Sequence, residues 1–204
     1  MSNLLSWSIE NSQTGESPQT QPGHKGQEPR GLSQDAIRSL MGGPSDADLM
    51  KQAMHVIVNP ESTLDAKITA FDNFEQLIEN LDNANNISPL GLWEPLMKQL
   101  DNEEAELRKM AAWCVGTAVQ NNEKCQAALL NIGGISKVAR MAVEDSDNAA
   151  RRKGVYALSS SVRNFQPGMD EALKTLPSNV TGPDHVNAGD MDVIDAIMEK
   201  LREG

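Results

Sequence analysis

The sequence predicts an all-α fold, a right-handed solenoid of about three stacked helical repeats behind a flexible N-terminal segment. Three stretches with apolar residues at helical spacing each end in an asparagine, at Asn80, Asn121 and Asn164, and these positions are 41 and 43 residues apart. A basic residue lies upstream in each stretch, and the three are Lys67, Arg108 and Arg151. A period of about 40 residues built from helices without strands is typical of armadillo and HEAT repeats.

Residues 1–44 are predicted to form the flexible N-terminal segment, with two short helices. The apolar face of the first helix consists of Leu4, Leu5 and Ile9. Residues 12–31 are rich in Pro, Gly, Gln and Ser, so they cannot bury enough apolar surface to offset the entropy of ordering. The second helix follows Ser33, ends at Gly42, and has one face made by Ile37, Leu40 and Met41.

Residues 45–175 are predicted to form the repeat domain, which begins with two helices. The first ends before Pro60, and its apolar face consists of Leu49, Met50, Ala53, Met54 and Ile57. The second is a long helix of about twenty residues, which Ser62 and Asp65 cap at its N-terminus. Its apolar residues recur every three or four positions, and they are Leu64, Ile68, Phe71, Phe74, Ile78 and Leu81.

Five further helices complete the predicted repeat domain. A short helix starts at Trp93, and the second long helix follows Asn102, which can cap it. The face of this long helix consists of Leu107, Met110, Ala111, Cys114, Val115 and Ala118. Shorter helices cover 125–130 and 138–143, and the third long helix starts near Asn148, with Val155, Leu158, Val162 and Phe165 inward.

Residues 176–204 are predicted to form a linker and a terminal helix. The stretch 176–189 contains two Pro and two Gly, which favour a linker. The terminal helix is amphipathic, and its apolar face consists of Met191, Ile194, Ile197, Met198 and Leu201.

Charge and composition limit the classes of partner. The net charge is −11, which argues against nucleic acid and against an anionic membrane surface, because both require neutralisation of negative charge. A basic partner fits better. The N-terminus has no basic leader, and no apolar run reaches the ~20 residues of a membrane span. We therefore expect a soluble, cytosolic protein.

No candidate catalytic or metal site emerges from the sequence. His24, His55 and His185 lie apart from one another and outside any metal-ligand spacing. Cys114 and Cys125 match no redox or metal motif and are predicted to be idle buried thiols. We expect no enzyme activity, no metal and no cofactor.

An acidic stripe is the strongest candidate for a binding feature. Asp72, Glu75, Glu79 and Asp82 are spaced 3, 4 and 3 residues apart, which places them on one side of a continuous helix. Like charges at these spacings cost about 0.2–0.5 kcal/mol per pair. A solvated helix face is the alternative, but the stripe continues into 83–86, which favours a docking edge for a basic partner. The cluster 151–153 spreads around its helix, and local pairing is the better interpretation there.

The three asparagines have two interpretations. Asparagine tolerates the left-handed conformation and can end a helix without any ligand. In armadillo cargo adaptors, an asparagine ladder binds extended peptides with the help of a tryptophan four residues earlier. The residues four positions before the asparagines here are Gln76, Thr117 and Ser160. Helix capping therefore ranks first and peptide binding second.

Three literal runs of sequence resemble a known family. They are residues 4–9, 70–87 and 116–122. They are similar to the armadillo-type nucleotide exchange factors of cytosolic heat-shock protein 70 kDa (Hsp70) chaperones, specifically the fungal Fes-type members. The resemblance extends to about Phe165, after which a further repeat of longer relatives is replaced by a linker and one helix.

The resemblance implies a non-catalytic monomer that binds the chaperone's ATPase domain, opens its nucleotide cleft and speeds the release of ADP. The docking residues that it implies are Glu79, Asp82, Asn83, Ala84, Asn85 and Asn86. It also implies that the N-terminal segment approaches the chaperone's substrate-binding domain, through Leu4, Leu5, Ile9, Leu40 and Met41. Packing of these residues on the solenoid is the alternative for that segment, and a generic armadillo peptide adaptor is the alternative for the function.

Overall fold

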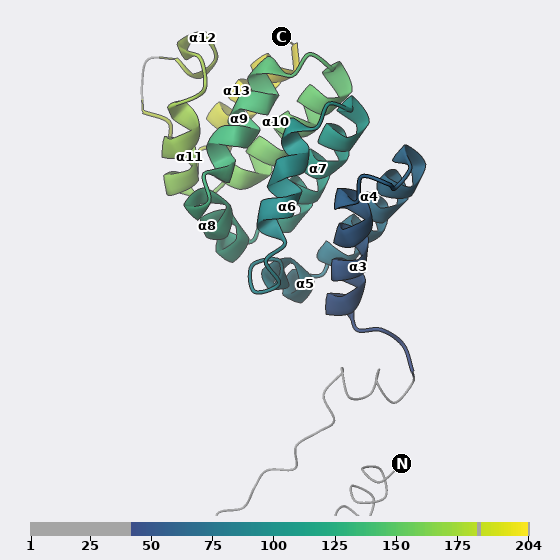
Figure 1. The fold of residues 1–204 in the computed structure, drawn as a ribbon. Helices are drawn as coiled ribbons and strands as arrows, with labels where there is room; N and C mark the ends of the chain where they lie inside the picture. The colour runs from purple at the N-terminus through teal and green to yellow at the C-terminus, as the bar shows by residue number, and fades with distance from the viewer. Residues whose placement is uncertain (1–41, 183–184, 204) are drawn as a thin grey trace, which may run out of the picture. The chain divides into compact units, whose positions relative to one another are not determined.

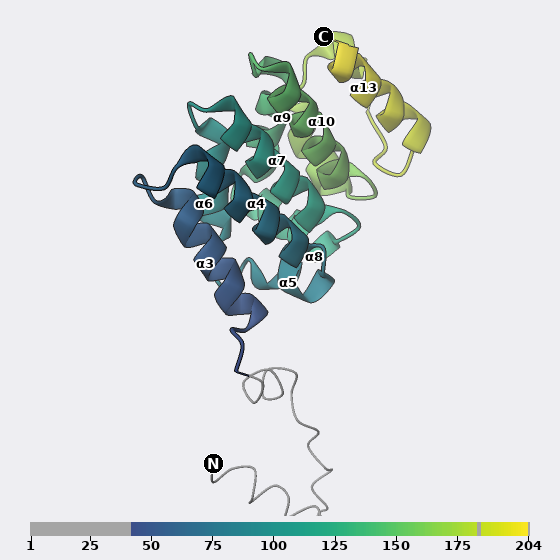
Figure 2. The same ribbon diagram turned by 90° about the vertical axis from the view of Figure 1, so that its right-hand side faces the viewer.

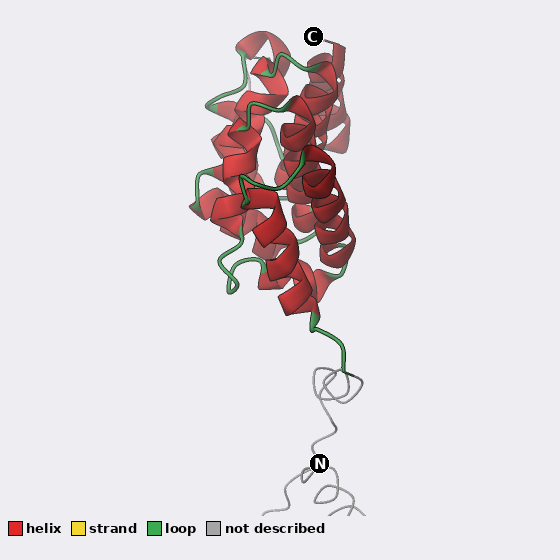
Figure 3. Cartoon of the chain, turned by 45° about the vertical axis from the view of Figure 1, so that its right-hand side comes forward, coloured by secondary structure: helices red, strands yellow, loops and turns green. Residues whose placement is uncertain are grey.

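The computed structural model describes residues 42–182 and 185–203, and in these ranges it contains helices joined by loops and no strand (Figures 1 and 3). The predicted all-α solenoid is confirmed. The predicted N-terminal helices lie outside the described residues, as do Leu4, Leu5, Ile9, Leu40 and Met41. The helices are α3 (Asp46–Val58), α4 (Leu64–Ile78), α5 (Leu81–Asn86), α6 (Trp93–Lys98), the 3-10 helix η1 (Gln99–Asp101), α7 (Ala105–Val119), α8 (Glu123–Asn131), α9 (Gly134–Glu144), α10 (Asn148–Val162), α11 (Gln166–Leu173), α12 (Ser178–Thr181) and α13 (Met191–Glu203).

The three long helices α4, α7 and α10 lie side by side in chain order (Figure 2). Two glycines allow α10 to approach its neighbours closely. A Cβ atom on Gly116 of α7 would lie 2.3 Å from the Tyr156 ring, and one on Gly154 of α10 would lie 3.0 Å from the Ala142 backbone nitrogen. Most of the residues predicted for the apolar faces of these helices lie in the core, in which Phe71, Val115 and Leu158 are fully buried. Leu64 at the start of α4 was also predicted to be buried, but it is 40% exposed because it lies in the first turn, at the end of the stack.

The first predicted long helix is in fact two helices. α4 ends at Ile78, and α5 begins at Leu81 after a turn at Asn80. Asn80 has φ −74°, and its side-chain oxygen accepts hydrogen bonds from the backbone N–H groups of Asp82 (2.9 Å) and Asn83 (3.4 Å). The prediction of one continuous helix was therefore wrong, because the side chain of Asn80 starts a new helix at the point where the old one ends. At the N-terminus of α4, Thr63 is the capping residue in place of Ser62.

The other two asparagines end their helices as predicted. Asn121 follows α7 with φ 52°, and Asn164 follows α10 with φ 54°. Both are in the left-handed region, where asparagine is tolerated better than most other residues. The helix-capping interpretation is confirmed at these two positions.

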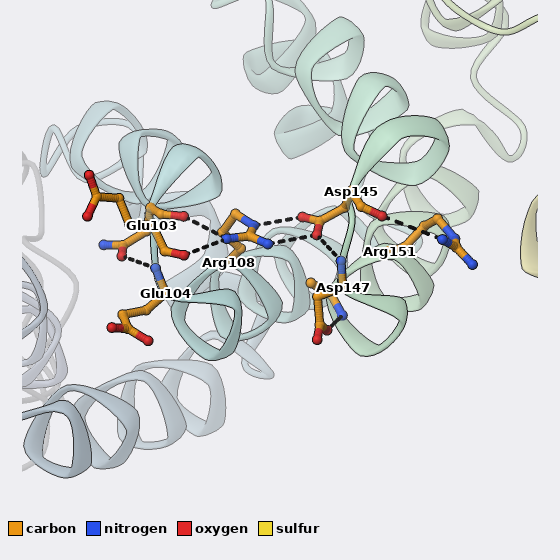
Figure 4. A network of polar contacts seen from close by, with 8 residues as sticks. Glu103, Glu104, Arg108, Asp145, Asp147 and Arg151 are labelled. Carbon is orange, nitrogen blue, oxygen red and sulfur yellow. Dashed lines mark hydrogen bonds and ion pairs between the residues drawn. The ribbon is translucent and has the colours of Figure 1, made fainter.

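An arginine–aspartate contact ties the loop before α7 to the loop before α10 (Figure 4). Arg108 donates from Nε and Nη2 to the two carboxylate oxygens of Asp145, at 2.7 and 2.8 Å. Its Nη1 donates to the backbone oxygens of Asn102 and Glu103, each at 2.9 Å. The Asp145 side chain is only 4% exposed. The hydrogen bonds from Arg108 lower the pKa of Asp145, although burial acts in the opposite direction.

Arg151 occupies the equivalent place one repeat later, at the right of Figure 4. Its Nη1 lies 3.5 Å from the Asp145 backbone oxygen, six residues upstream, just as Arg108 reaches the backbone oxygen of Asn102 six residues upstream. Its Nε is buried and has no hydrogen-bond acceptor among the described residues. The local pairing expected for 151–153 is thus only partly formed at Arg151.

The C-terminal residues pack on the stack, whereas the sequence favoured a linker there. Gln166 anchors residues 186–188, because its Oε1 accepts from the Ala188 N–H (2.8 Å) and its Nε2 donates to the Val186 oxygen (3.0 Å). Helix α13 contacts α10, and Arg163 at the end of α10 forms an ion pair with Asp195. The buried side chains of α13 are Ile194, Ile197, Met198 and Leu201.

Candidate partner-binding surface

The predicted docking residues lie on α5 and on the turn that precedes it, and we call residues 79–86 the α5 edge. Glu79, Asp82 and Asn86 are exposed, and Asn85 is half-buried. These are the members of the predicted set whose side chains a partner can reach. Because Glu79 and Asp82 carry no ion pair among the described residues, the exposed part of the edge is anionic.

The other two predicted residues hold the edge in place. Asn83 is 8% exposed, and its Nδ2 donates to the Asp46 Oδ2 of α3 (3.1 Å) and to the Leu77 backbone oxygen of α4 (2.9 Å). Ala84 is 2% exposed, and its backbone oxygen accepts from the Cys125 thiol of α8 at 3.3 Å. These residues position α5 against three helices, while their own side chains face inward.

Leu81 is an exposed apolar side chain in the middle of this acidic edge. The sequence placed it in the buried stripe of the first long helix, and that prediction was wrong. It is 58% exposed, because the turn at Asn80 begins a new helix and breaks the apolar register. The sequence analysis did not predict Leu81 to be exposed, and the capping pattern of Asn80 was the available signal.

The acidic stripe does not continue along one surface. Glu75 is 5% exposed and accepts a hydrogen bond from the Thr117 hydroxyl of α7 at 2.7 Å. Asp72 accepts from the Gln76 side chain on its own helix at 3.1 Å. Asp82 lies on a different helix from these two residues. Glu75 therefore packs against α7, Asp72 pairs within α4, and only Glu79 and Asp82 belong to the exposed α5 edge.

A cleft of about 410 Å³ adjoins the α5 edge and crosses the three long helices. Its lining residues are Glu75, Glu79, Trp113, Thr117, Gln120, Asn121 and Tyr156. The ammonium of Lys153 lies 4.2 Å from the centroid of the Trp113 ring and 5.3 Å from that of Tyr156. Burial lowers the pKa of Lys153, and the charge of Glu75 acts in the opposite direction.

The sequence analysis did not predict the aromatic residues of this cleft, because they do not have the spacing found in peptide adaptors. Trp113 and Tyr156 lie eight residues before Asn121 and Asn164, whereas the tryptophan of peptide adaptors lies four residues before its asparagine. Eight residues are slightly more than two helical turns, and Trp113 and Asn121 both line the cleft. An (i, i+8) comparison between repeats would have found them.

The rest of the described chain offers little reaction chemistry. Burial raises the pKa of the Cys125 thiol to about 11, and it raises the pKa of Cys114 well above its ordinary value, so both thiols are unreactive. His55 and His185 are exposed, and the described residues contain no group of three or more side chains that could hold a metal ion. A search of the same residues found no helix with the length and apolarity to cross a membrane.

Comparisons with known proteins place these features in a family context. Residues 1–87 match the family described as nucleotide exchange factor Fes1, and residues 83–175 match the SIL1/FES1/HPBP1 C-terminal domain. A protein of Coccidioides immitis named Hsp70 nucleotide exchange factor FES1 is 52% identical over 205 residues, which cover 100% of this chain and 97% of the relative. A protein of the same name from Gibberella zeae is 52% identical over 207 residues, which cover 100% and 95%.

A solved structure supports the architecture. A designed armadillo repeat protein in complex with the peptide (KR)4 aligns with a TM-score of 0.55 and 21% sequence identity, covering 82% of this chain and 68% of that one. At this identity the likeness concerns the fold alone.

Proposed function

This chain belongs to the Fes1 family of Hsp70 nucleotide exchange factors, and from that premise we propose that it binds the ATPase domain of a cytosolic Hsp70-type chaperone and accelerates the release of ADP. The observation that carries this proposal is the 52% identity, along the whole chain, to proteins named for this activity. The proposed activity asks for binding alone, and it needs no catalytic group of the factor itself.

The proposed mechanism is a shift of population. If the protein binds the open form of the ATPase domain more tightly than the closed form, then at saturation it raises the ratio of open to closed form by the ratio of the two affinities. A tenfold preference corresponds to about 1.4 kcal/mol. ADP leaves the open form sooner, so ATP can bind and the chaperone can release its substrate.

We propose the α5 edge as part of the contact. Glu79 and Asp82 would face basic groups of the chaperone, Leu81 would contribute apolar contact, and the amides of Asn85 and Asn86 would supply hydrogen bonds. Asn83 and Ala84 would not touch the chaperone. They would keep the exposed residues of the edge in place, because they fix α5 against α3, α4 and α8. An exposed apolar side chain within a charged rim is a common arrangement at the centre of an interface.

Release of fluorescent ADP from the isolated chaperone ATPase domain tests the proposal. We expect the rate constant to rise with the concentration of this protein and to reach a plateau. If saturating protein, bound as judged by pull-down, leaves the rate unchanged, the exchange function is wrong, and an adaptor that binds an extended peptide becomes the better description.

The N-terminal segment is proposed to contact the chaperone's substrate-binding domain through Leu4, Leu5, Ile9, Leu40 and Met41, all outside the described residues. Removing residues 1–41 should leave the exchange rate with the isolated ATPase domain unchanged. With the full-length chaperone, the same truncation should slow the release of a labelled peptide substrate. An unchanged release of peptide would contradict this part of the proposal.

A further inference from the structure

The cleft beside the α5 edge is built around two aromatic rings from neighbouring repeats. Trp113 comes from α7, and Tyr156 from α10. The ring of Tyr156 lies directly against Gly116, where any side chain would collide with it, and its hydroxyl is 3.3 Å from the Gln120 Oε1 of α7. The absence of a side chain at residue 116 thus fixes the ring of Tyr156 on the surface of α7, at the edge of the cleft.

A positive charge already occupies this aromatic position. Lys153 belongs to α10, and its ammonium lies over Trp113 at 4.2 Å and near Tyr156 at 5.3 Å. Both distances are within the range of about 6 Å in which a cation is attracted by the face of a ring. Lys153 is not among the residues that line the cleft, but its ammonium occupies the Trp113 ring, which does line it, so this ring already holds one cation of the protein itself.

The remaining wall of the cleft is anionic and polar. Glu75 is buried and held by Thr117, while Glu79 is exposed, so its carboxylate is available to an incoming group. Asn121 at the end of the cleft is exposed, and its side chain has no hydrogen bond within the described part of the chain. A guanidinium would find here a ring to stack on, a carboxylate to pair with and an amide oxygen to donate to.

Building on the proposed function, we propose that this cleft binds a lysine or arginine side chain of the chaperone's ATPase domain, and that Lys153 occupies the ring of Trp113 in the free protein until that side chain displaces it. Arginine is the better fit, because its planar group can stack on Trp113 while it pairs with Glu79. Lys153 then lowers the affinity of the cleft for that side chain, because it competes for the ring of Trp113.

The substitution Lys153→Gln tests the competition, with Arg152→Gln as its matched control. Both remove one positive charge, but Arg152 is exposed and contacts no aromatic ring of the described residues. We expect Lys153→Gln to bind the ATPase domain at least about threefold more tightly than Arg152→Gln, since the cation–π contact of Lys153 no longer has to be given up. Equal or weaker binding by Lys153→Gln would overturn the inference.

A second measurement uses a probe in place of the chaperone. A tetra-arginine peptide should shift the indole N–H resonance of Trp113 saturably in Lys153→Gln and less in the unsubstituted protein, while a tetra-citrulline peptide should not. Adding Glu79→Gln, at an exposed position, should weaken the binding of tetra-arginine several-fold. No shift in Lys153→Gln with tetra-arginine would reject the cleft as a cation site.

The two experiments separate this inference from the proposed function. If the protein speeds the release of ADP but Lys153→Gln does not bind more tightly, the inference fails and the function stands. If tetra-arginine binds the cleft while the ATPase domain is not bound at all, the chaperone is wrong as the occupant and the exchange function fails with it.

Discussion

Individual residues of the α5 edge differ in what a substitution there can reveal. Glu79 and Asp82 are exposed, so their substitution changes the surface alone, whereas Ala84 is buried under the contact between α5 and α8. Experiments on this edge therefore have to distinguish a loss of contacts with the partner from a loss of the packing that holds α5 in place.

Reversing both exposed charges, Glu79→Lys with Asp82→Lys, should weaken binding of the chaperone ATPase domain. Because exposed pairs contribute about 0.2–1 kcal/mol each, and reversal also adds repulsion, we expect about a tenfold loss of affinity that shrinks at high salt. The control is Asp192→Lys with Glu203→Lys on α13, which changes the net charge equally at exposed positions. Isothermal titration at two salt concentrations measures both. Equal losses for the two double variants would mean that net charge alone acts.

Ala84→Arg should lower the stability of the protein as well as its binding. The side chain at this position is 2% exposed, so an arginine must displace α5 or bury its charge, and we expect a loss of at least about 2 kcal/mol in the free energy of unfolding. Urea denaturation followed by circular dichroism measures it. A variant that remains as stable as the original protein would show that residue 84 points outward.

At the scale of elements, the spacing of apolar residues predicted most of the helices, but not where they break. The stripes of α7 and α10 could be read from the sequence, because each is one uninterrupted helix. The break between α4 and α5 could not, since apolar spacing continues across it through Ile78 and Leu81. Whether the helix continues past Ile78 depends on two competing interactions, the hydrogen bonds of one more helical turn and the side-chain cap of Asn80. The spacing of apolar residues does not show which of them is stronger.

The three asparagines should respond differently to substitution, because one starts a helix and two end one. Asn80→Ala should cost about 1 kcal/mol through loss of the N-cap of α5. Asn121→Gly should change stability by less than about 0.5 kcal/mol or raise it, because glycine accepts φ 52° without strain. Chemical denaturation of the two variants side by side gives both values. A larger loss for Asn121→Gly would mean that its amide has a structural role.

The contact between Arg108 and Asp145 makes the junction of two repeats sensitive to acid. Its aspartate has a folded pKa below the unfolded value of about 3.9, so the contact stabilises the fold above about pH 4, and that contribution is lost as the pH falls through the folded pKa. At pH 7, Asp145→Asn should cost about 3 kcal/mol, because it leaves a half-buried guanidinium without its counter-charge. The difference between the two proteins should shrink below pH 4. A difference that does not change with pH would show that the contact acts by shape alone.

On the scale of the whole molecule, the C-terminal residues close the stack, although their composition favoured a linker. Pro and Gly in residues 176–189 do interrupt the helices. The segment is nevertheless held by the side chain of Gln166, which hydrogen-bonds to the backbone of Val186 and Ala188. A contact between residues about twenty positions apart produces no periodic pattern in the sequence, so it could not be predicted from residue spacing. The cleft at Trp113 was hidden for a related reason, because its walls come from three repeats.

Ile194→Ala should test whether α13 is part of the cooperative unit. Ile194 is fully buried, so its truncation should cost about 2–5 kcal/mol, while Val193→Ala at a 39% exposed position on the same helix should change stability by less than about 0.5 kcal/mol. Urea unfolding followed by circular dichroism compares them. If both substitutions are neutral, α13 does not stabilise the stack.

The buried Nε of Arg151, which has no acceptor among the described residues, suggests a way to extend the stack. At the previous junction, the same donor meets an aspartate supplied by the following repeat, whereas the described residues supply no acceptor to the Arg151 Nε. Grafting one more unit of about 43 residues after α11, with an aspartate in the register of Asp145, would give this donor an anion at a geometry the protein already uses once. Arg151 thus provides the donor half of an arginine–aspartate contact that an added repeat could complete.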